Sequence, residues 1–452
     1  MTAVEEQVKE LSAGFSGRLL RPGDAAYDEA RRVHNGLIDR RPALIARCRN
    51  AADAARAVVF ANEHGLEIAV RGGGHNVAGR AVTEGGLMID LAEMKGIEVD
   101  PGARTARAEG GVNWNELNAA TYEHGLAVTG GAVSTTGIAG LTLGGGLGWL
   151  MGVQGFASDN LISVELVSAT GDVLDVTQES HPDLFWALRG GGGNFGVATS
   201  FVYRLHPVGQ VIGGLAVHPF TAAKEVLTFY RDFTRSLPDE LTVFAALTHA
   251  PDGSGAKIAA LAVCHVGPTE QADADLTPVR AFGEPLMVEI GPMPYPVMNT
   301  LLDDAFPKGA LNYWKSNFVE TFDDGLIDVV VERFASVPSP MSAILFEHLH
   351  GEVTRIPVES AAVAQRDEGY NVLIPGVWMD PTETDANVAW VRETYDALRP
   401  YFRDGRWLNY LDDDEPSDAI RAAYGPNYDR LVEAKRAYDP ANVFHLNHNI
   451  QP

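Results

Sequence analysis

The chain has 452 residues, which is more than one hydrophobic core usually accommodates and indicates two or three domains. Its net charge of −25 repels nucleic acids and acidic membrane surfaces, so neither is expected as a partner. The two cysteines, Cys48 and Cys264, offer no disulfide framework, and no segment looks like a signal peptide or a membrane-spanning helix. We therefore expect a cytoplasmic location.

The N-terminal part predicts alternating helices and strands. Residues 50–65, "NAADAARAVVFANEHG", combine an asparagine N-cap, an alanine-rich body and a glycine stop, which predicts a helix. The apolar run "LEIAV" at 66–70 predicts a buried strand that leads into "RGGGHN" at 71–76. Further strands are expected at 87–91 and 96–100, then a capped helix from Asn113 and a hairpin over 161–176.

Three glycine clusters stand out among the 47 glycines of the chain. They lie at 70–79, 137–152 and 184–196. Glycine-rich loops allow backbone N–H groups to converge on phosphate oxygens, because no Cβ atom keeps the anion away. None of the clusters has the pattern of a Rossmann turn or a P-loop. Each cluster alone fits ordinary turn structure better than it fits a ligand site.

The composition changes after residue 207. The middle of the chain has fewer glycines, a helical stretch from 221, and strand-like runs at 311–319 and 341–353. The last segment, "YDPANVFHLNHNIQP", is rich in asparagine and turn residues, which is unusual for an end left free in solvent. We expect this segment to dock at a polar site.

Five motifs together resemble the FAD-linked oxidases related to berberine bridge enzyme, within the vanillyl-alcohol oxidase and p-cresol methylhydroxylase superfamily. They are "RGGGHN" at 71–76, "TLGGGLGWLMGVQGFASDNL" at 142–161, "LFWALRGGGGNFG" at 184–196, "LNYLDDD" at 408–414 and "YDPANVFHLNHNI" at 438–450. The resemblance implies an α+β fold with two lobes, of the p-cresol methylhydroxylase type. The expected domains are a FAD-binding domain at 1–208, an antiparallel-sheet substrate domain at 209–404, and a C-terminal segment at 405–452 that completes the FAD lobe.

The resemblance also implies how FAD is held. In such enzymes the histidine of the first motif is bonded to the 8α-methyl carbon of the flavin, which implies a covalent role for His75. Many relatives carry a second attachment through a cysteine, which is Val133 here, so a single bond is expected. Thr136 stands where relatives have a valine beside the oxygen-reacting face. The further cofactor-binding residues implied are Arg71, Gly72, Gly73, Gly74, Asn76, Gly137, Gly140, Asp159, Asn160 and Asn447. For Asp159 and Asn160, a role in stabilising the loop is the alternative.

Catalytic candidates are fewer. Tyr410 matches an aromatic residue that faces the flavin pocket in the family, and a phenol there can exchange a proton. His348 and His350, in "FEHLHGEV", alternate along a strand and so share one face, although both could be exposed polar residues. Lys315 is a further candidate, with a surface position as its alternative. Gln365 stands where many relatives have a histidine.

The expected activity is FAD-dependent removal of hydride from a small alcohol or amine, with electrons passed to O2 to give H2O2. A carbohydrate oxidase, a dehydrogenase with another electron acceptor, and a flavin-binding protein without turnover remain alternatives. The 13 histidines show no metal-binding spacing, so no metal is expected. The expected partners are the small-molecule substrate and O2, and the oligomeric state stays open.

Overall fold

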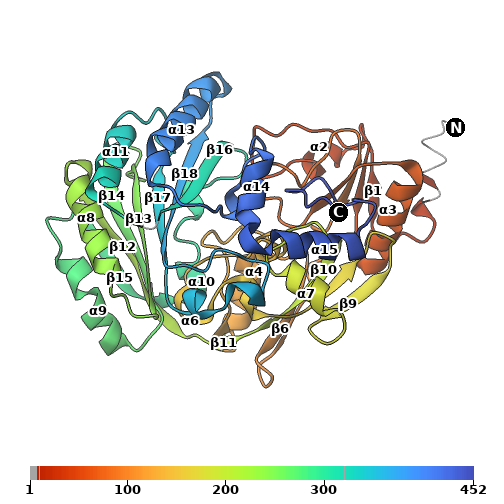
Figure 1. Cartoon of the computed structure of the whole chain (residues 1–452), viewed down its shortest axis with the longest axis horizontal. Helices are drawn as coiled ribbons and strands as arrows, with labels where there is room; N and C mark the ends of the chain where they lie inside the picture. Colours follow the sequence, from red (N-terminus) through yellow and green to blue (C-terminus); the bar gives the residue numbers. More distant parts are fainter. Residues whose placement is uncertain (1–7, 10, 320) are drawn as a thin grey trace.

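The structure is a computed structural model that describes residues 8–9, 11–319 and 321–452. It has two lobes that lie side by side, with the N-terminal lobe on the right of Figure 1 and the central lobe on the left. The C-terminal helices, in dark blue, return to the N-terminal lobe. The expected α+β class is confirmed, because mixed and antiparallel sheets are each covered by helices.

The N-terminal lobe contains a four-stranded sheet in the order β1-β2-β4-β3 and a five-stranded antiparallel sheet in the order β5-β6-β10-β8-β9. Strands β2, β4 and β3 are parallel, whereas β1 is antiparallel to β2. The strands are β1 (Arg18–Leu20), β2 (Leu44–Arg47), β3 (Ile68–Arg71), β4 (Leu87–Asp90), β5 (Ile97–Asp100), β6 (Thr105–Glu109), β7 (Leu126–Ala127), β8 (Leu161–Val167), β9 (Val173–Thr177), β10 (Val197–Arg204) and β11 (His206–Pro207). The helices are α2 (Tyr27–Ala30), α3 (Ala51–His64), α4 (Trp114–Tyr122), α5 (Ile138–Leu143), α6 (Met151–Gln154) and α7 (Pro182–Leu188).

Helix α3 shows why the local sequence folds as it does. The Asn50 side chain accepts a hydrogen bond from the backbone N–H of Asp53, and Gly65 ends the helix in the left-handed conformation at φ +61°. The body of the helix buries alanines against the four-stranded sheet. Strand β3 follows directly, so this well-defined unit fixes where the glycine run after β3 begins.

The central lobe is a seven-stranded sheet in the order β15-β12-β14-β13-β17-β18-β16, and each of these neighbouring pairs is antiparallel. Its strands are β12 (Gln210–Pro219), β13 (Leu241–His249), β14 (Lys257–His265), β15 (Met287–Pro294), β16 (Leu311–Val319), β17 (Ile344–Leu349) and β18 (Gly369–Trp378). Its helices are α8 (Ala223–Thr234), α9 (Thr269–Ala281), α10 (Tyr295–Met298), α11 (Asp324–Ala335), α12 (Glu352–Arg355) and α13 (Thr384–Leu398).

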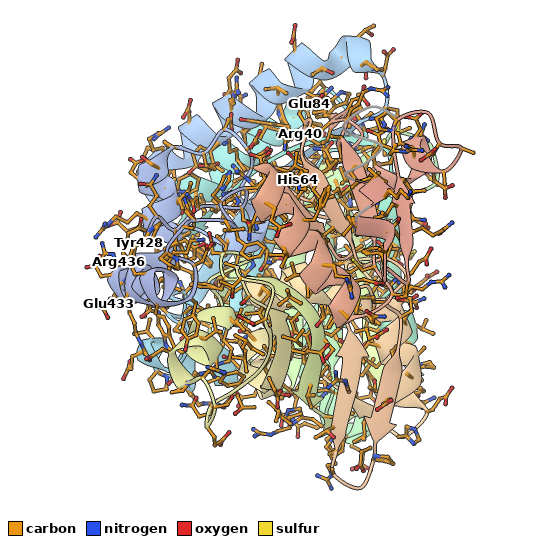
Figure 2. All side chains as sticks on the ribbon, turned by 90° about the vertical axis from the view of Figure 1, so that its right-hand side faces the viewer. Arg40, His64, Glu84, Tyr428, Glu433 and Arg436 are labelled. Carbon is orange, nitrogen blue, oxygen red and sulfur yellow. The ribbon has the colours of Figure 1, made fainter. Side chains whose placement is uncertain are left out.

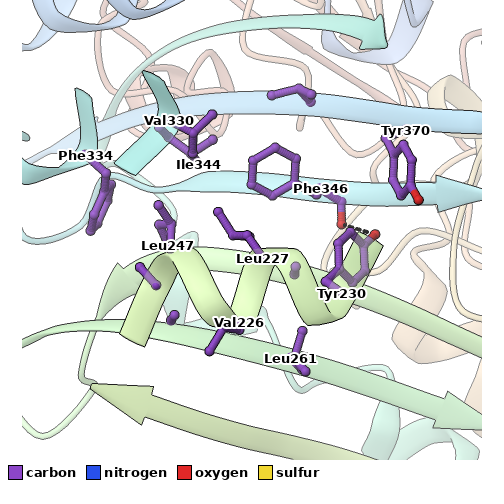
Figure 3. Close-up of a cluster of buried hydrophobic side chains, with 14 of the residues drawn as sticks. Val226, Leu227, Tyr230, Leu247, Leu261, Val330, Phe334, Ile344, Phe346 and Tyr370 are labelled. Atoms are coloured by element: carbon purple, nitrogen blue, oxygen red, sulfur yellow. Dashed lines mark hydrogen bonds between the residues drawn. The ribbon is translucent and has the colours of Figure 1, made fainter. Parts of the chain in front are cut away.

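One face of this sheet forms the largest hydrophobic core. Figure 3 shows Leu227 and Tyr230 of α8 packed on the sheet, with Phe346 of β17 opposite them. The Tyr230 hydroxyl donates a hydrogen bond to the Phe346 carbonyl at 3.2 Å, drawn as a dashed line (Figure 3). Because side chains alternate along a strand, the neighbours of Phe346 point to the opposite face. That opposite face looks toward the N-terminal lobe.

The C-terminal segment carries α14 (Ser417–Tyr424) and α15 (Tyr428–Tyr438), and α15 packs against α7. Beyond α15, the backbone N–H of Ile450 donates to the Asn194 side chain at 3.1 Å. The last residues therefore dock onto the third glycine cluster. Figure 2 shows Glu433 and Arg436 of α15 on the outside of the molecule, where both are exposed. Across the described ranges, no helix combines the length and apolar character needed to cross a membrane.

Candidate active site

A cavity lies at the boundary between the two lobes. The N-terminal lobe lines it with the glycine loop after β3, with residues of the second glycine cluster, and with Gly192, Gly193 and Asn194. The central lobe contributes side chains from β16, β17 and β18, while the segment 407–410 and Asn447 come from the C-terminal part. Segments from the whole length of the chain thus converge on one space.

The glycine loop after β3 is shaped by close backbone contact. A Cβ atom on Gly73 would lie 2.5 Å from the backbone nitrogen of Gly137, and one on Gly137 would lie 2.4 Å from that of Gly73. Gly74 adopts φ +65°, which side-chain-bearing residues rarely do. At Gly140, by contrast, a Cβ atom would meet nothing within 4 Å, so the cavity is open beside it. The first two glycine clusters therefore touch and form one continuous cradle.

His75 follows this cradle and lines the cavity. Its ring stacks on the ring of His34, with centroids 3.9 Å apart and planes 24° apart. The Nε2 atom is buried and has no hydrogen-bond partner. Burial, with the nearby His34 as a second cause, lowers the pKa of His75 to about 3. The imidazole is therefore neutral at physiological pH and keeps a free electron pair.

Arg71 and Asn76 hold the ends of the glycine loop in place. Arg71 donates two hydrogen bonds to the buried Asp90 carboxylate, at 2.9 and 2.6 Å, and does not line the cavity. Arg71 therefore stabilises the start of the loop through Asp90, whereas the motif resemblance implied that it contacts the cofactor. Asn76 does line the cavity, and its side chain donates to the Asn409 carbonyl at 3.0 Å.

The C-terminal segment adds polar groups on the other side of the cavity. Asn447 lines it, and its side chain donates to the Gly193 carbonyl at 2.8 Å. Arg80 also lines the cavity, and its Nε atom is buried without a partner. The residue is half-buried, and its terminal nitrogens already bond to the Leu446 carbonyl at 2.8 Å and to the Asp413 carboxylate at 3.0 Å. Only the Nε–H group is left to donate to an anionic ligand group such as a phosphate. Arg80 carries no signal in the sequence, because it lies outside the glycine run.

A carboxylate and a phenol meet in the same cavity. The Tyr410 hydroxyl donates to Glu347 Oε1 at 2.9 Å, and the Asn371 side chain donates to Glu347 Oε2 at 2.6 Å. Burial raises the pKa of Glu347 to about 7, although both hydrogen bonds act in the opposite direction. Burial and the Glu347 charge raise the pKa of Tyr410, so the phenol keeps its proton. Glu347 therefore titrates near neutrality, as a proton acceptor in a catalytic site does.

The structure does not bring His348 and His350 to this cavity. Their rings stack with centroids 5.1 Å apart, so they do share one side, as expected from alternation. That side is the helix-covered face, where the His348 ring packs on Tyr370 with centroids 4.8 Å apart. Glu347, one position earlier, points the opposite way into the cavity. Both histidines are buried, so the alternative of exposed polar residues is also wrong.

Asp159 and Asn160 do not line the cavity either. Arg366 donates two hydrogen bonds to the Asp159 carboxylate, at 2.7 and 2.6 Å. The Asn160 side chain donates to the carbonyls of Gln154 and Phe156, both at 2.9 Å. Both residues hold the loop after the second glycine cluster, which is the alternative to a direct contact with the cofactor.

Lys315 and Gln365 lie outside the cavity. Lys315 is 8% exposed and donates to Asp414 at 2.6 Å and to Glu415 at 2.5 Å, so it is neither a surface lysine nor a base in the cavity. Gln365 packs against Gly405. Val133 and Thr136 do line the cavity, beside the second glycine cluster.

Comparison with known proteins agrees with this geometry. Residues 42–177 match the FAD binding domain family, and residues 406–451 match the berberine and berberine-like family. The chain is 32% identical, over 451 residues, to an FAD-linked oxidoreductase of Dictyostelium discoideum, covering 98% of this chain and 97% of the relative. It belongs to the berberine-bridge-enzyme-like FAD-linked oxidoreductases.

Another member of the family is similar in both sequence and structure. The (R)-6-hydroxynicotine oxidase of Paenarthrobacter nicotinovorans is 30% identical over 450 residues, with 97% of both chains covered. A crystal structure of 6-hydroxy-D-nicotine oxidase from Arthrobacter nicotinovorans has a TM-score of 0.89 and 29% identity, covering 98% of this chain and 99% of that one. The two-lobed fold of the p-cresol methylhydroxylase type is thus confirmed.

The cavity fits the FAD that this berberine-bridge-enzyme-like family binds. The glycine cradle lines the cavity without Cβ atoms, so its backbone can approach a pyrophosphate, the half-buried Arg80 has a free Nε–H group, and His75 Nε2 lacks a partner inside the protein. Besides Arg80, the sequence did not reveal Glu347 and His34 as functional residues. Glu347 could have been noticed as the acidic residue of an apolar strand, whereas the stacking of His34 on His75 leaves no sequence signal.

Proposed function

We propose that the chain is an oxidase that carries FAD on His75, oxidises a small alcohol or amine, and passes the electrons to O2 to give H2O2. The observation that carries this proposal is the pairing of Glu347 with Tyr410 in the cavity that also holds His75. Bound FAD would supply the hydride acceptor, and the protein must supply position and proton transfer.

In this proposal the residues around the cavity bind, attach and enclose the cofactor. Gly72, Gly73 and Gly74 bind the pyrophosphate through the backbone, while Asn447 closes the cavity from the C-terminal side. His75 holds the flavin by one bond, since the position of a second attachment is occupied by Val133. An imidazole kept neutral by burial is a competent nucleophile for forming such a bond.

Glu347 would accept the proton that the substrate hydroxyl or amine loses as its C–H bond breaks. Its pKa of about 7 places a useful fraction of carboxylate at neutral pH. The Tyr410 hydroxyl lines the cavity beside Glu347 and can relay that proton, because it both donates to the carboxylate and keeps a lone pair. His348 and His350 have no part in this scheme, since they face away.

The substrate side of the cavity favours a small apolar molecule. Leu302, Phe306, Trp314, Leu345 and Leu373 line it, with Glu347 and Tyr410 as its polar groups. An oligosaccharide would bury many hydroxyl groups against such a surface without partners, which costs free energy for each unpaired group. The composition therefore supports an apolar alcohol or amine over the carbohydrate alternative.

A substrate panel tests this proposal. The purified yellow protein is mixed anaerobically with aryl or alkyl amines, secondary alcohols and oligosaccharides, and bleaching of the flavin is recorded before air is admitted. We expect bleaching by an amine or alcohol, followed by recovery of colour with release of H2O2. Bleaching by oligosaccharides alone would show that the substrate is a carbohydrate and not a small alcohol or amine. Bleaching without peroxide in air would indicate an electron acceptor other than O2. No bleaching by any compound would support a protein that binds flavin without turnover.

A further inference from the structure

The loop between α2 and β2 brings a second histidine against His75. His34 is 5% exposed, and its ring lies on that of His75 with centroids 3.9 Å apart. Its Nε2 atom is buried and has no hydrogen-bond partner. Burial, followed by the charge of Lys308, lowers the pKa of His34 to about 4. A buried imidazole, that of His34, is therefore stacked on the half-buried imidazole of His75, and both rings are neutral.

The backbone holds His34 firmly in this place. Its N–H donates to the Gly74 carbonyl at 2.9 Å, next to His75 in the chain, and its own carbonyl accepts from Gly309 at 2.9 Å. The following residue, Asn35, donates from its side chain to the carbonyls of Val77 and Asn312, at 2.8 and 2.9 Å. The loop thus ties the glycine cradle to the central lobe and carries the His34 ring with it.

We propose that His34 is a positioning residue for the covalent attachment of FAD, in that its ring fixes the plane in which the His75 imidazole meets the flavin. This inference rests on the proposed attachment through His75. The imidazole electron pair lies in the plane of its ring, so its direction is set by the orientation of that plane. The His34 backbone is hydrogen-bonded to both lobes, and stacking on its ring restricts rotation about the side-chain bonds of His75.

The attachment step balances with O2 as its oxidant. A ring nitrogen of His75 forms a bond to the 8α-methyl carbon, and one C–H bond of that methyl group breaks. The methyl proton and the imidazole N–H proton leave, and the electron pair passes by way of the flavin to O2, which becomes H2O2. His34 takes no proton from His75 in this step, because stacked rings do not point their nitrogens at each other. Its contribution is geometric, and a misplacement of about 1 Å can slow a reaction by about 100-fold.

Three variants separate a stacking role from other roles. His34→Phe keeps a planar ring without nitrogen atoms, whereas His34→Leu keeps an apolar side chain of smaller but comparable size without a ring. His218→Leu is the matched control, because His218 is also a buried histidine but lies on β12, where its ring contacts Phe282 and not His75. Each protein is produced without flavin and incubated with FAD in air. The fraction of flavin that stays on the acid-precipitated chain is followed over time, alongside the affinity for FAD before attachment.

We expect wild type, His218→Leu and His34→Phe to attach FAD at similar rates, and His34→Leu to attach it at least about tenfold more slowly with little change in affinity. A rate in His34→Leu equal to that of wild type would overturn the role of His34 while the attachment itself stands. A tenfold slower His34→Phe would also overturn it, because a ring alone would then not suffice, and this variant decides the matter if His34→Leu does not fold. Wild type without any adduct would overturn both the attachment and this inference.

Discussion

Glu347→Gln should change both the turnover of the enzyme and the pH dependence of its stability, because the same carboxylate determines both. Its pKa rises from an ordinary 4.5 to about 7 on folding, chiefly through burial. Between these two pH values the folded protein binds more protons at this site than the unfolded chain, so the wild type loses stability as the pH rises through the window. Above pH 7 this pKa shift lowers the free energy of unfolding by about 3 kcal/mol relative to its value at low pH.

The neighbourhood can accept the neutral amide. Tyr410 continues to donate to the oxygen at position 347, and the Asn371 amide can turn over, because its Oδ1 atom is buried without a partner and would then accept from the new N–H group. We therefore expect Glu347→Gln to match the wild type in stability near pH 4.5 and to exceed it by about 3 kcal/mol at pH 8. Turnover should fall by about 100-fold or more, because the proton acceptor is gone.

Chemical denaturation of both holoproteins at a series of pH values, followed by circular dichroism, measures this difference. Glu289→Gln, at an exposed position on the edge strand β15, is the control and should show no such pH dependence. The reasoning would be refuted if the two proteins differed equally at every pH, or if Glu347→Gln were the less stable protein at pH 8.

Three other substitutions probe the cavity and its supports. Tyr410→Phe removes the hydrogen bond that lowers the Glu347 pKa, so the rise of kcat/KM with pH should move to a higher pH while the maximal rate falls about 10- to 100-fold; an unmoved pH profile would contradict the pairing. Gly73→Ala places a methyl group 2.5 Å from a backbone nitrogen, so the purified protein should lose most of its yellow colour, and full flavin content would contradict the cradle. Arg366→Ala leaves the buried Asp159 carboxylate unpaired, which should cost about 3–5 kcal/mol in denaturant titrations without altering substrate preference, and a loss below about 1 kcal/mol would show that the pair is dispensable.

Local sequence was sufficient to predict much of the fold. The caps of α3 and the glycines after β3 lie where the sequence placed them, because caps and positive-φ positions depend on neighbours in the chain. Tyr410 and Asn447 line the cavity, as the motif resemblance implied. These features are local or belong to a shared motif, so they could be predicted before the structure was available.

Other features depend on tertiary packing. Strand alternation correctly grouped His348 with His350, but it does not say which face of the sheet meets the cavity, so Glu347 was missed. The burial of Lys315 depends on two carboxylates that arrive from the C-terminal segment. His34 reaches His75 only because a loop from before the first parallel strand packs across the glycine cradle.

The proposed function depends on the covalent bond between His75 and FAD, and the mass of one peptide tests whether that bond exists. The denatured chain is digested, and the peptide that contains His75 is weighed in the wild type and compared with the corresponding peptide of His75→Ala. We expect the wild-type peptide to be heavier by FAD less two hydrogen atoms, and the variant peptide to carry no flavin. Release of all flavin from the wild type on denaturation, or its recovery on a different peptide, would show that His75 does not carry FAD.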